Sequence, residues 1–291
     1  MENKKEEYEL LTVHGTPELK IRYRHADFSP KGSILFVHGI CHGAWCWKHF
    51  MTYFSKNGYE CFALNLRGHG DNDRSDLKGS RLSDYADDVK RCVDYCTAYC
   101  SKRGLLEKPF LLGHSMGGAV VQKYIGRYSD KVKGAVLFAS ATAPKMPWLK
   151  TILSLRKKNL RTAAQISWGI AKTDEEVAQS AFFDNKITSE EEIHQYHELL
   201  HKEAWRITFI SLYLPYTKNH EVTIPVFVIG SDEDSYFPKK SLGKTADVYT
   251  CKENDKRKRL KILEGLCHDM MLDPKRERAA EAVLEFLEQN K

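Results

Sequence analysis

The residue with the clearest chemical potential in this chain is Ser115, which stands in the pentapeptide Gly113-His114-Ser115-Met116-Gly117 directly after an apolar run. A serine between glycines at the junction of a strand and a helix is typical of a sharp turn that only glycine-sized neighbours allow. Such a turn leaves the serine hydroxyl exposed above the sheet. The pattern therefore predicts a nucleophile at Ser115, with an ordinary glycine turn as the alternative.

A serine nucleophile requires a base and an acid elsewhere in the chain, because an imidazole must accept its proton and a carboxylate must orient that imidazole. After such a turn, the chain order is nucleophile, acid, base. Asp234 follows the apolar run 224–230, and His268 follows the run 260–264. We predict Asp234 as the acid and His268 as the base. Asp232 is the rival acid, and spacing alone does not separate the two.

A fourth element of the same chemistry lies near the start of the chain. Attack on a carbonyl places negative charge on its oxygen, which two preorganised backbone N–H groups stabilise. One donor is expected from the residue after the nucleophile and one from the loop that follows an early strand. The apolar run 33–37 precedes His38-Gly39-Ile40, so we predict an oxyanion hole formed by the N–H groups of Ile40 and Met116. The alternative is that these glycines only form a turn.

Composition indicates one domain with an elaboration. The 291 residues contain no Pro/Gly/Ser linker and no repeat, and the net charge of +6 is too modest to indicate a nucleic-acid partner. Residues 1–9 are rich in charge, and we find neither a signal peptide nor an apolar run of about 18 residues, so a cytoplasmic protein is expected. Its 8 cysteines are then expected to be free thiols. The predicted chemistry requires no metal and no organic cofactor.

Two local patterns have a structural and a functional interpretation. Cys92, Cys96 and Cys100 recur on one face of an expected helix but spread over about 12 Å, too far to bind one ion, so we predict an apolar stripe packed on the sheet. The segment 145–161 is basic and interleaved with apolar residues. We interpret it as a solvated face; the alternative is contact with an anionic membrane surface or substrate.

The order of the apolar runs predicts an α/β fold with a mostly parallel central sheet flanked by helices. An antiparallel hairpin is expected at 8–13 and 19–24. Parallel strands are expected near 33–37, 60–66, 109–113, 133–139, 224–230 and 259–264. Helices are expected near 45–56, 82–102, 116–128 and 275–289.

The alternation of strands and helices stops between residues 140 and 223, in a stretch too long for a simple connection and helical in periodicity. We predict a core of residues 1–140 and 223–291 with a helical lid inserted at 141–222. Part of the lid's large apolar side chains pack its helices on the core, and the rest are expected to roof a substrate pocket. The candidate pocket residues are Trp148, Trp168, Phe182, Phe183, Trp205 and Phe209. An apolar roof excludes water and favours a hydrophobic acyl or alcohol group.

The chain resembles proteins of the α/β-hydrolase fold over nearly its whole length. His38-Gly39, Arg67-Gly68-His69-Gly70, the serine turn, and the segments 230–238 and 265–268 occur in the family's order and spacing. The stretch 38–45 is similar to the plant methylesterase and hydroxynitrile lyase branch. The serine turn and the tail after residue 268 are equally similar to bacterial esterases and lysophospholipase-like members.

Two departures from branches of this family narrow the expected chemistry. The lyases carry a threonine, which holds the cyanohydrin hydroxyl, where this chain has Gly39. The dehalogenases carry an aspartate nucleophile where this chain has Ser115. The resemblance therefore disfavours both lyase and dehalogenase chemistry.

The resemblance and the residues together predict a serine hydrolase that cleaves a carboxylic ester of a small molecule through an acyl-enzyme intermediate. The same three residues would also serve a lactone, thioester, amide or carbon–carbon bond, which fold analogy does not rank. An alternative of another class is a ligand receptor on a hydrolase scaffold. The sequence leaves the substrate and the oligomeric state open.

Overall fold

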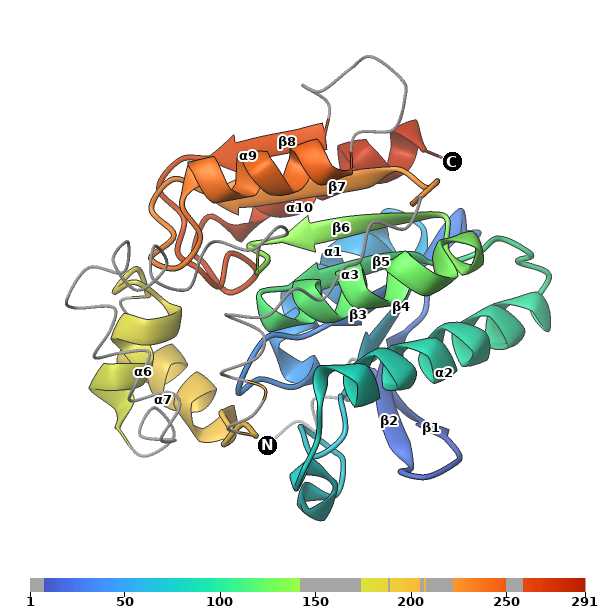
Figure 1. The fold of residues 1–291 in the computed structure, drawn as a ribbon, viewed down its shortest axis with the longest axis horizontal. Coiled ribbons are helices and arrows are strands. Elements are labelled where there is room, and N and C mark those ends of the chain that lie inside the picture. Colours follow the sequence, from blue (N-terminus) through green and yellow to red (C-terminus); the bar gives the residue numbers. More distant parts are fainter. Residues whose placement is uncertain are drawn as a thin grey trace.

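The core of the protein is a single eight-stranded sheet with the strand order β1-β2-β4-β3-β5-β6-β7-β8 (Figure 1). The computed structural model describes residues 8–141, 174–187, 189–204, 207, 222–249 and 259–290. The strands are β1 (Glu9–Val13), β2 (Leu19–Arg24), β3 (Gly32–Val37), β4 (Tyr59–Leu64), β5 (Phe110–His114), β6 (Gly134–Phe138), β7 (Val226–Ser231) and β8 (Leu260–Leu263). The predicted α/β class is therefore confirmed.

The pairing of the strands brings their carboxyl ends to one edge of the sheet. β1 and β2 form the predicted antiparallel hairpin, and β2 also runs antiparallel to β4. From β4 onward the neighbours are parallel, with Val37 opposite Gly113, His114 opposite Phe138, and Ser231 opposite Leu263. Loops that follow β3, β5 and β7 therefore emerge close together, at the edge where ligands meet open α/β sheets.

Helices cover both faces of the sheet, and each face has its own apolar core. The helices and short 3-10 turns of the core are η1 (Ala44–Trp47), α1 (Lys48–Lys56), η2 (Arg74–Leu77), α2 (Leu82–Ser101), α3 (Met116–Tyr128), η3 (Ser129–Lys131), α9 (Lys239–Val248) and α10 (Arg276–Gln289). Buried residues of α1 and α10 share one core cluster, whereas those of α2, α3 and α9 share the other. The elements form a three-layered α/β/α arrangement (Figure 1).

The cysteine stripe of α2 packs as predicted. Cys92, Cys96 and Cys100 are at most 1% exposed and belong to the core cluster between α2 and the sheet. All the cysteines among the described residues are free and buried. Burial raises the pKa of the Cys92 and Cys96 thiols well above 9.0, as an apolar packing role requires.

Two helices of the inserted segment, α6 (Glu175–Phe182) and α7 (Glu190–Leu199), occur between β6 and β7. The Asp174 side chain accepts the N–H of Val177 at the start of α6, and the Ser189 side chain accepts the N–H of Glu192 at the start of α7. In Figure 1 both helices lie beyond the carboxyl ends of the strands. The predicted pocket residues Trp148, Trp168, Trp205 and Phe209 and the basic segment 145–161 lie outside the described residues, and the boundaries 141–222 stay a prediction.

The strands and core helices expected from the sequence all occur, with ends that differ by at most two residues except at α1. A helix was expected from residue 45, but α1 begins at Lys48, after the 3-10 turn η1. The structure also contains the helix α9, which was not predicted from the sequence. The buried face of α9 consists of Leu242, Ser241 and Thr245, so Leu242 is its only apolar buried side chain. Among the helices that the structure describes, none is long and apolar enough to cross a membrane.

Candidate active site

Ser115 occupies a strained turn between β5 and α3. Its backbone has φ 51° and ψ −116°, a combination that non-glycine residues rarely adopt. The turn is held from three sides: the Ser115 N–H donates to the carbonyl of Phe138 at 3.1 Å, and the Ser115 carbonyl accepts the N–H groups of Gly118 and Ala141, each at 3.0 Å. A β-carbon at Gly117 would lie 2.4 Å from the His38 carbonyl oxygen, so the helix start can approach β3 only without a side chain there.

Three side chains from separate loops form a continuous polar chain. The Oγ of Ser115 lies 3.0 Å from Nε2 of His268, and Nδ1 of His268 donates to Oδ2 of Asp234 at 3.0 Å. The other oxygen of Asp234 accepts the backbone N–H groups of Tyr236 and Phe237, at 2.7 and 3.1 Å. The His268 and Asp234 side chains are 4% and 0% exposed, so this chain of hydrogen bonds is shielded from water.

The rival acid, Asp232, lies elsewhere. Its side chain accepts the N–H of Gly265 at 2.9 Å and lies 3.6 Å from the Lys239 ammonium group. It thus fixes the base of the loop after β8. The structure brings Asp234 to His268 and leaves Asp232 at the surface.

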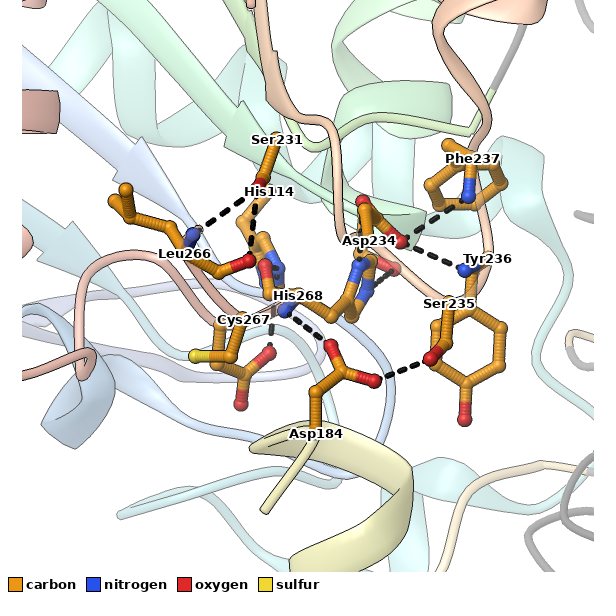
Figure 2. A network of polar contacts seen from close by, with 12 residues as sticks. His114, Asp184, Ser231, Asp234, Ser235, Tyr236, Phe237, Leu266, Cys267 and His268 are labelled. Carbon is orange, nitrogen blue, oxygen red and sulfur yellow. Dashed lines mark hydrogen bonds and ion pairs between the residues drawn. The ribbon is translucent and has the colours of Figure 1, made fainter. Parts of the chain in front are cut away.

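Both backbone polar groups of His268 are hydrogen-bonded (Figure 2). Its N–H donates to Oδ2 of Asp184 at 2.8 Å, and its carbonyl oxygen accepts Nε2 of His114 at 3.3 Å. The rings of Tyr236 and Phe237 lie 4.8 and 5.6 Å from the imidazole, between ring centres. His268 therefore has little freedom to leave Ser115.

The charges around His268 favour its protonated form. Burial alone would lower its pKa, but the carboxylates of Asp234, Asp269 and Asp184 outweigh burial and raise the pKa from 6.5 to about 9. The neighbouring His114 behaves in the opposite way, because burial lowers its pKa to about 3. An imidazolium at residue 268 is thus stabilised beside a neutral imidazole at residue 114.

The loop after β3 is oriented by two histidines. Nδ1 of His38 donates to the Gly39 carbonyl at 2.8 Å, while its Nε2 accepts the N–H of Leu66 at 3.1 Å, a pattern that only the neutral ring satisfies. Burial keeps the pKa of His38 well below 6.5. Since His38 fixes the Gly39 carbonyl, it also fixes the plane of the peptide that carries the Ile40 N–H.

The second histidine is His42, which holds the next peptide. Its Nδ1 donates to the Ile40 carbonyl at 2.6 Å, and its Nε2 donates to Oδ2 of Asp269 at 2.8 Å. Burial would raise the pKa of Asp269, but His42 and then His114 lower it. Ile40 and Met116 therefore stand in rigid backbone, at the end of β3 and at the start of α3. Their role as oxyanion donors stays a prediction.

A separate buried polar cluster joins the inserted segment to the core. One carboxylate oxygen of Glu203 accepts Nε2 of His69 at 3.0 Å, and the other accepts the hydroxyl of Tyr85 at 2.7 Å and the N–H of Ala204 at 2.8 Å. Nδ1 of His69 donates to the Arg67 carbonyl at 2.9 Å. Burial would lower the pKa of His69, but Glu203 raises it above 6.5.

The two described candidate pocket residues are buried side chains of the apolar core. Phe182 and Phe183 are 2% and 0% exposed. The ring of Phe182 meets His42 edge-on at 5.0 Å, and the ring of Phe183 lies 5.8 Å from Tyr196 of α7. These contacts pack the inserted helices on the core, the structural alternative that the sequence left open, and their contact with a substrate stays a prediction.

Among the described residues, His114, His268 and Asp269 place one ligand atom each within 4.8 Å of one another, as a metal site would. Both ring nitrogens of His268 already face protein partners, Asp234 and Ser115. A metal on this ring would have to displace one of them. We therefore interpret the three residues as part of the hydrogen-bond network around Ser115 and not as a metal site.

Several residues of this region were not predicted from the sequence to take part in the site: Asp184, His42, His38, Asp269 and Glu203. His42 and His38 lie in the segment that the analysis singled out, where two further histidines beside the glycine turn were a usable signal. Asp184 and Glu203 carry no comparable signal, because they belong to the inserted segment and reach the core only through the tertiary fold.

The chain is similar to known proteins over different shares of its length. The model of a family described as "Serine aminopeptidase, S33" matches residues 29–275. "Methyl jasmonate esterase 1" of Vitis vinifera is 34% identical over 110 residues, 38% of this chain and 39% of that protein. "Putative esterase/lipase 2" of Mycoplasma pneumoniae is 30% identical over 132 residues, 44% of this chain and 46% of that protein. The chain thus covers less than half the length of these curated relatives.

Solved structures share the fold over almost the whole chain. A bromoperoxidase from Bacillus anthracis superposes with a TM-score of 0.75 at 16% identity, covering 97% of this chain and 99% of that one. The esterase EaEST from Exiguobacterium antarcticum gives a TM-score of 0.72 at 18% identity, with 95% and 98% covered. At these identities the similarity concerns the fold alone.

Proposed function

Because this chain belongs to the α/β-hydrolase family described as serine aminopeptidase, S33, we propose that it is a serine hydrolase that cleaves a carboxylic ester through an acyl-enzyme intermediate. The observation that carries the proposal is the hydrogen-bonded chain from Ser115 through His268 to Asp234, with the serine in a strained turn between strand and helix. A serine, an imidazole and a carboxylate in this geometry are the elements of nucleophilic acyl transfer.

In the proposed reaction the Oγ of Ser115 attacks the ester carbonyl carbon while its proton passes to Nε2 of His268. Asp234 keeps the ring in the tautomer that presents an unprotonated Nε2 to the serine. The former carbonyl oxygen becomes negatively charged, and the N–H groups of Ile40 and Met116 donate to it. The tetrahedral intermediate then breaks the bond to the alcohol, which leaves with the proton that His268 returns.

The second half of the reaction releases the acyl group by the same route. A water molecule gives one proton to His268 and attacks the acyl carbonyl. The bond to Oγ of Ser115 breaks, and the proton returns from His268 to the serine. Each step uses only groups of the chain, the ester and water.

The substrate class that we propose is an ester with a hydrophobic acyl or alcohol group. The support is the position of the inserted helices beyond the carboxyl ends of the strands, next to the loops that carry His268 and Asp234 (Figure 1). Phe182 and Asp184 contact that region directly. We propose that the inserted segment covers the site as a lid, which would exclude water and select an apolar group.

The test is the Ser115→Ala variant, assayed with nitrophenyl esters of increasing acyl length. We expect a normally folded protein whose turnover falls by about 10⁴-fold or more. Ser101→Ala, an exposed serine at the end of α2, is the matched control and should retain wild-type turnover. If Ser115→Ala hydrolysed these esters at nearly the wild-type rate, Ser115 would not be the nucleophile.

Two further assays separate the alternatives. A fluorophosphonate probe should label the wild-type protein and fail to label Ser115→Ala, whereas a receptor with an inert serine would remain unlabelled in both. Nitroanilide, thioester and lactone substrates, assayed beside the esters, would rank the bond types. A higher kcat/KM on the nitroanilide would replace the ester by an amide in our proposal.

A further inference from the structure

The turn at the end of α6 reaches the two loops that carry Asp234 and His268. The carbonyl of Phe182 accepts the N–H of Asp269 at 3.2 Å, which ties the turn to the loop after β8. The ammonium group of Lys186 pairs with Glu233 in the loop after β7. Asp184, between these two contacts, touches both loops at once. Figure 2 shows it rising from the inserted segment toward His268 and Ser235.

The two oxygens of Asp184 have different partners. Oδ2 accepts the backbone N–H of His268 at 2.8 Å, and Oδ1 accepts the hydroxyl of Ser235. Nearer the sheet the same loops are joined by the Ser231 hydroxyl, which donates to the Leu266 carbonyl at 2.7 Å. Asp184 therefore joins the loop after β7 to the loop after β8 close to the His268 ring, where that ring meets Asp234.

The backbone of this turn explains which residue types fit. Asp184 and Asn185 have φ values of 45° and 58°, in the left-handed region that Asp and Asn tolerate better than other side chains. An asparagine would satisfy the turn equally well and would avoid burying a charge, which costs free energy unless the charge has a favourable partner. Burial raises the pKa of the Asp184 carboxyl, while the Ser235 hydroxyl and then the His268 ring and N–H oppose that rise. The carboxylate is thus paired with His268 electrostatically as well as by its hydrogen bond.

We infer that Asp184 is a positioning residue of the active site, a carboxylate of the inserted segment that holds the His268 loop against the Asp234 loop and stabilises the imidazolium formed when His268 accepts the serine proton. This inference rests on the proposed function. It makes the inserted segment a structural part of the catalytic apparatus, because its α6 turn supplies one of the four hydrogen-bond partners of His268 in the described residues.

Besides Asp184, the titratable groups that act on or pack against His268 are Asp234, Asp269, His114 and Tyr236, and the experiment must account for them. Asp234 lies on the loop after β7 and Asp269 follows His268 in the chain, and both favour the protonated ring. His114 of β5 packs against the ring at 4.9 Å and stays neutral because its pKa is about 3. Since these groups stay in place when Asp184 is changed, the difference between variants reports Asp184.

Two variants separate the charge of Asp184 from its hydrogen bonds. Asp184→Asn suits the left-handed turn, and its amide can accept from the His268 N–H and donate to Ser235, so only the charge is lost. Asp184→Ala loses both contacts. Asp94→Asn is the matched control, because it removes a negative charge from an exposed pair within α2 and leaves every contact of the α6 turn in place.

The measurement is an NMR titration of the His268 ring, identified by its absence in His268→Gln, together with the pH dependence of kcat and KM for a nitrophenyl ester. For Asp184→Asn we expect the His268 midpoint and the acid limb of kcat/KM to fall by about one pH unit, with plateau kcat nearly retained. For Asp184→Ala we expect a similar fall and a loss of kcat of about tenfold, with KM nearly unchanged. Asp94→Asn should match the wild type.

An unchanged His268 midpoint in Asp184→Asn would overturn the inference, and so would wild-type kcat in Asp184→Ala. If Asp184→Ala does not fold, the midpoint and acid limb of Asp184→Asn decide alone. The NMR titration needs no turnover. If the wild-type protein hydrolysed no ester, the proposed function would be contradicted. The titration would still test the effect of Asp184 on the protonation of His268.

Discussion

Gly39 and His114 are packed so closely that no side chain fits between them. A β-carbon at Gly39 would lie 2.7 Å from Nδ1 of His114 and 3.2 Å from the β-carbon of Ser115. The loop that carries the Ile40 N–H thereby rests directly on the turn of the proposed nucleophile. Because the glycine is required by this contact, the absence of the threonine found in hydroxynitrile lyases is built into the packing of the site.

Gly39→Thr should therefore damage the site without creating a new activity. The added atoms must displace His114 or the loop, so we expect a loss of about 1–3 kcal/mol in the free energy of unfolding and of about 10²-fold in ester turnover. Urea denaturation and nitrophenyl ester kinetics measure both losses. Gly126→Ala in α3, where a β-carbon meets nothing within 4 Å, is the control and should be neutral or stabilising. Cyanohydrin cleavage by Gly39→Thr would contradict this view.

The two acids after β7 should respond very differently to the same substitution. Asp234→Asn places an amide against Nδ1 of His268 and favours the wrong ring tautomer, so we expect kcat to fall by about 10⁴-fold. Asp232→Asn keeps an acceptor for the Gly265 N–H and should leave kcat within about threefold of wild type. Steady-state kinetics of both variants test the assignment. A larger loss in Asp232→Asn would transfer the acid role to Asp232.

Ester hydrolysis should increase with pH well above neutrality. The general base must be unprotonated at Nε2, and the carboxylates around His268 raise its pKa to about 9. Below that value the neutral fraction grows about tenfold per pH unit, so kcat/KM should rise with this slope from pH 7 and level off above about pH 9. A pH profile with an alkali-stable ester checks the slope and the midpoint. A profile that is flat from pH 7 to 10 would show that another group controls the rate.

The sequence predicted the order of the elements well because short apolar runs, separated by glycine turns, have few alternatives in a chain of this kind. It did not predict α9, whose buried face includes Ser241 and Thr245 and therefore lacks the apolar period of a surface helix. The order of the strands in the sheet could not be predicted from the sequence either. That β4 lies between β2 and β3 depends on which strands pair, which periodicity does not encode.

For the site, the sequence identified residues that follow a strand and missed those that reach the site from outside the core. Ser115, Asp234 and His268 each follow an apolar run, so their meeting at one edge could be inferred from topology. Asp184 lies at the end of an eight-residue helix in an insertion. Its contact with the His268 N–H depends on how that helix docks, and a single aspartate among many gives no sign of it.

The buried pair of Glu203 and His69 gives a last prediction, which concerns stability instead of catalysis. Burial would raise the pKa of Glu203, but His69 and Tyr85 lower it below 4.5, and Glu203 raises the pKa of His69 above 6.5. A lowered carboxyl pKa gives stability that is lost as pH falls through the folded-state value. A raised imidazole pKa gives stability that is complete below about pH 6.5 and lost as pH rises through its folded-state value. The pair should therefore stabilise the fold most strongly between about pH 4.5 and 6.5.

The variant Glu203→Gln should reveal the pH range in which this pair stabilises the fold. Removing one partner of a buried pair costs about 3–5 kcal/mol, so we expect a loss of that order near pH 5.5 that shrinks toward both lower and higher pH. Urea denaturation across pH 4–9 measures the difference from wild type. Asp94→Asn, which breaks the exposed pair of Lys90 and Asp94, is the control and should cost less than about 0.5 kcal/mol at every pH. A pH-independent loss in Glu203→Gln would mean that the carboxylate acts there through packing and its neutral hydrogen bonds, and that charge contributes nothing to the docking of the inserted segment.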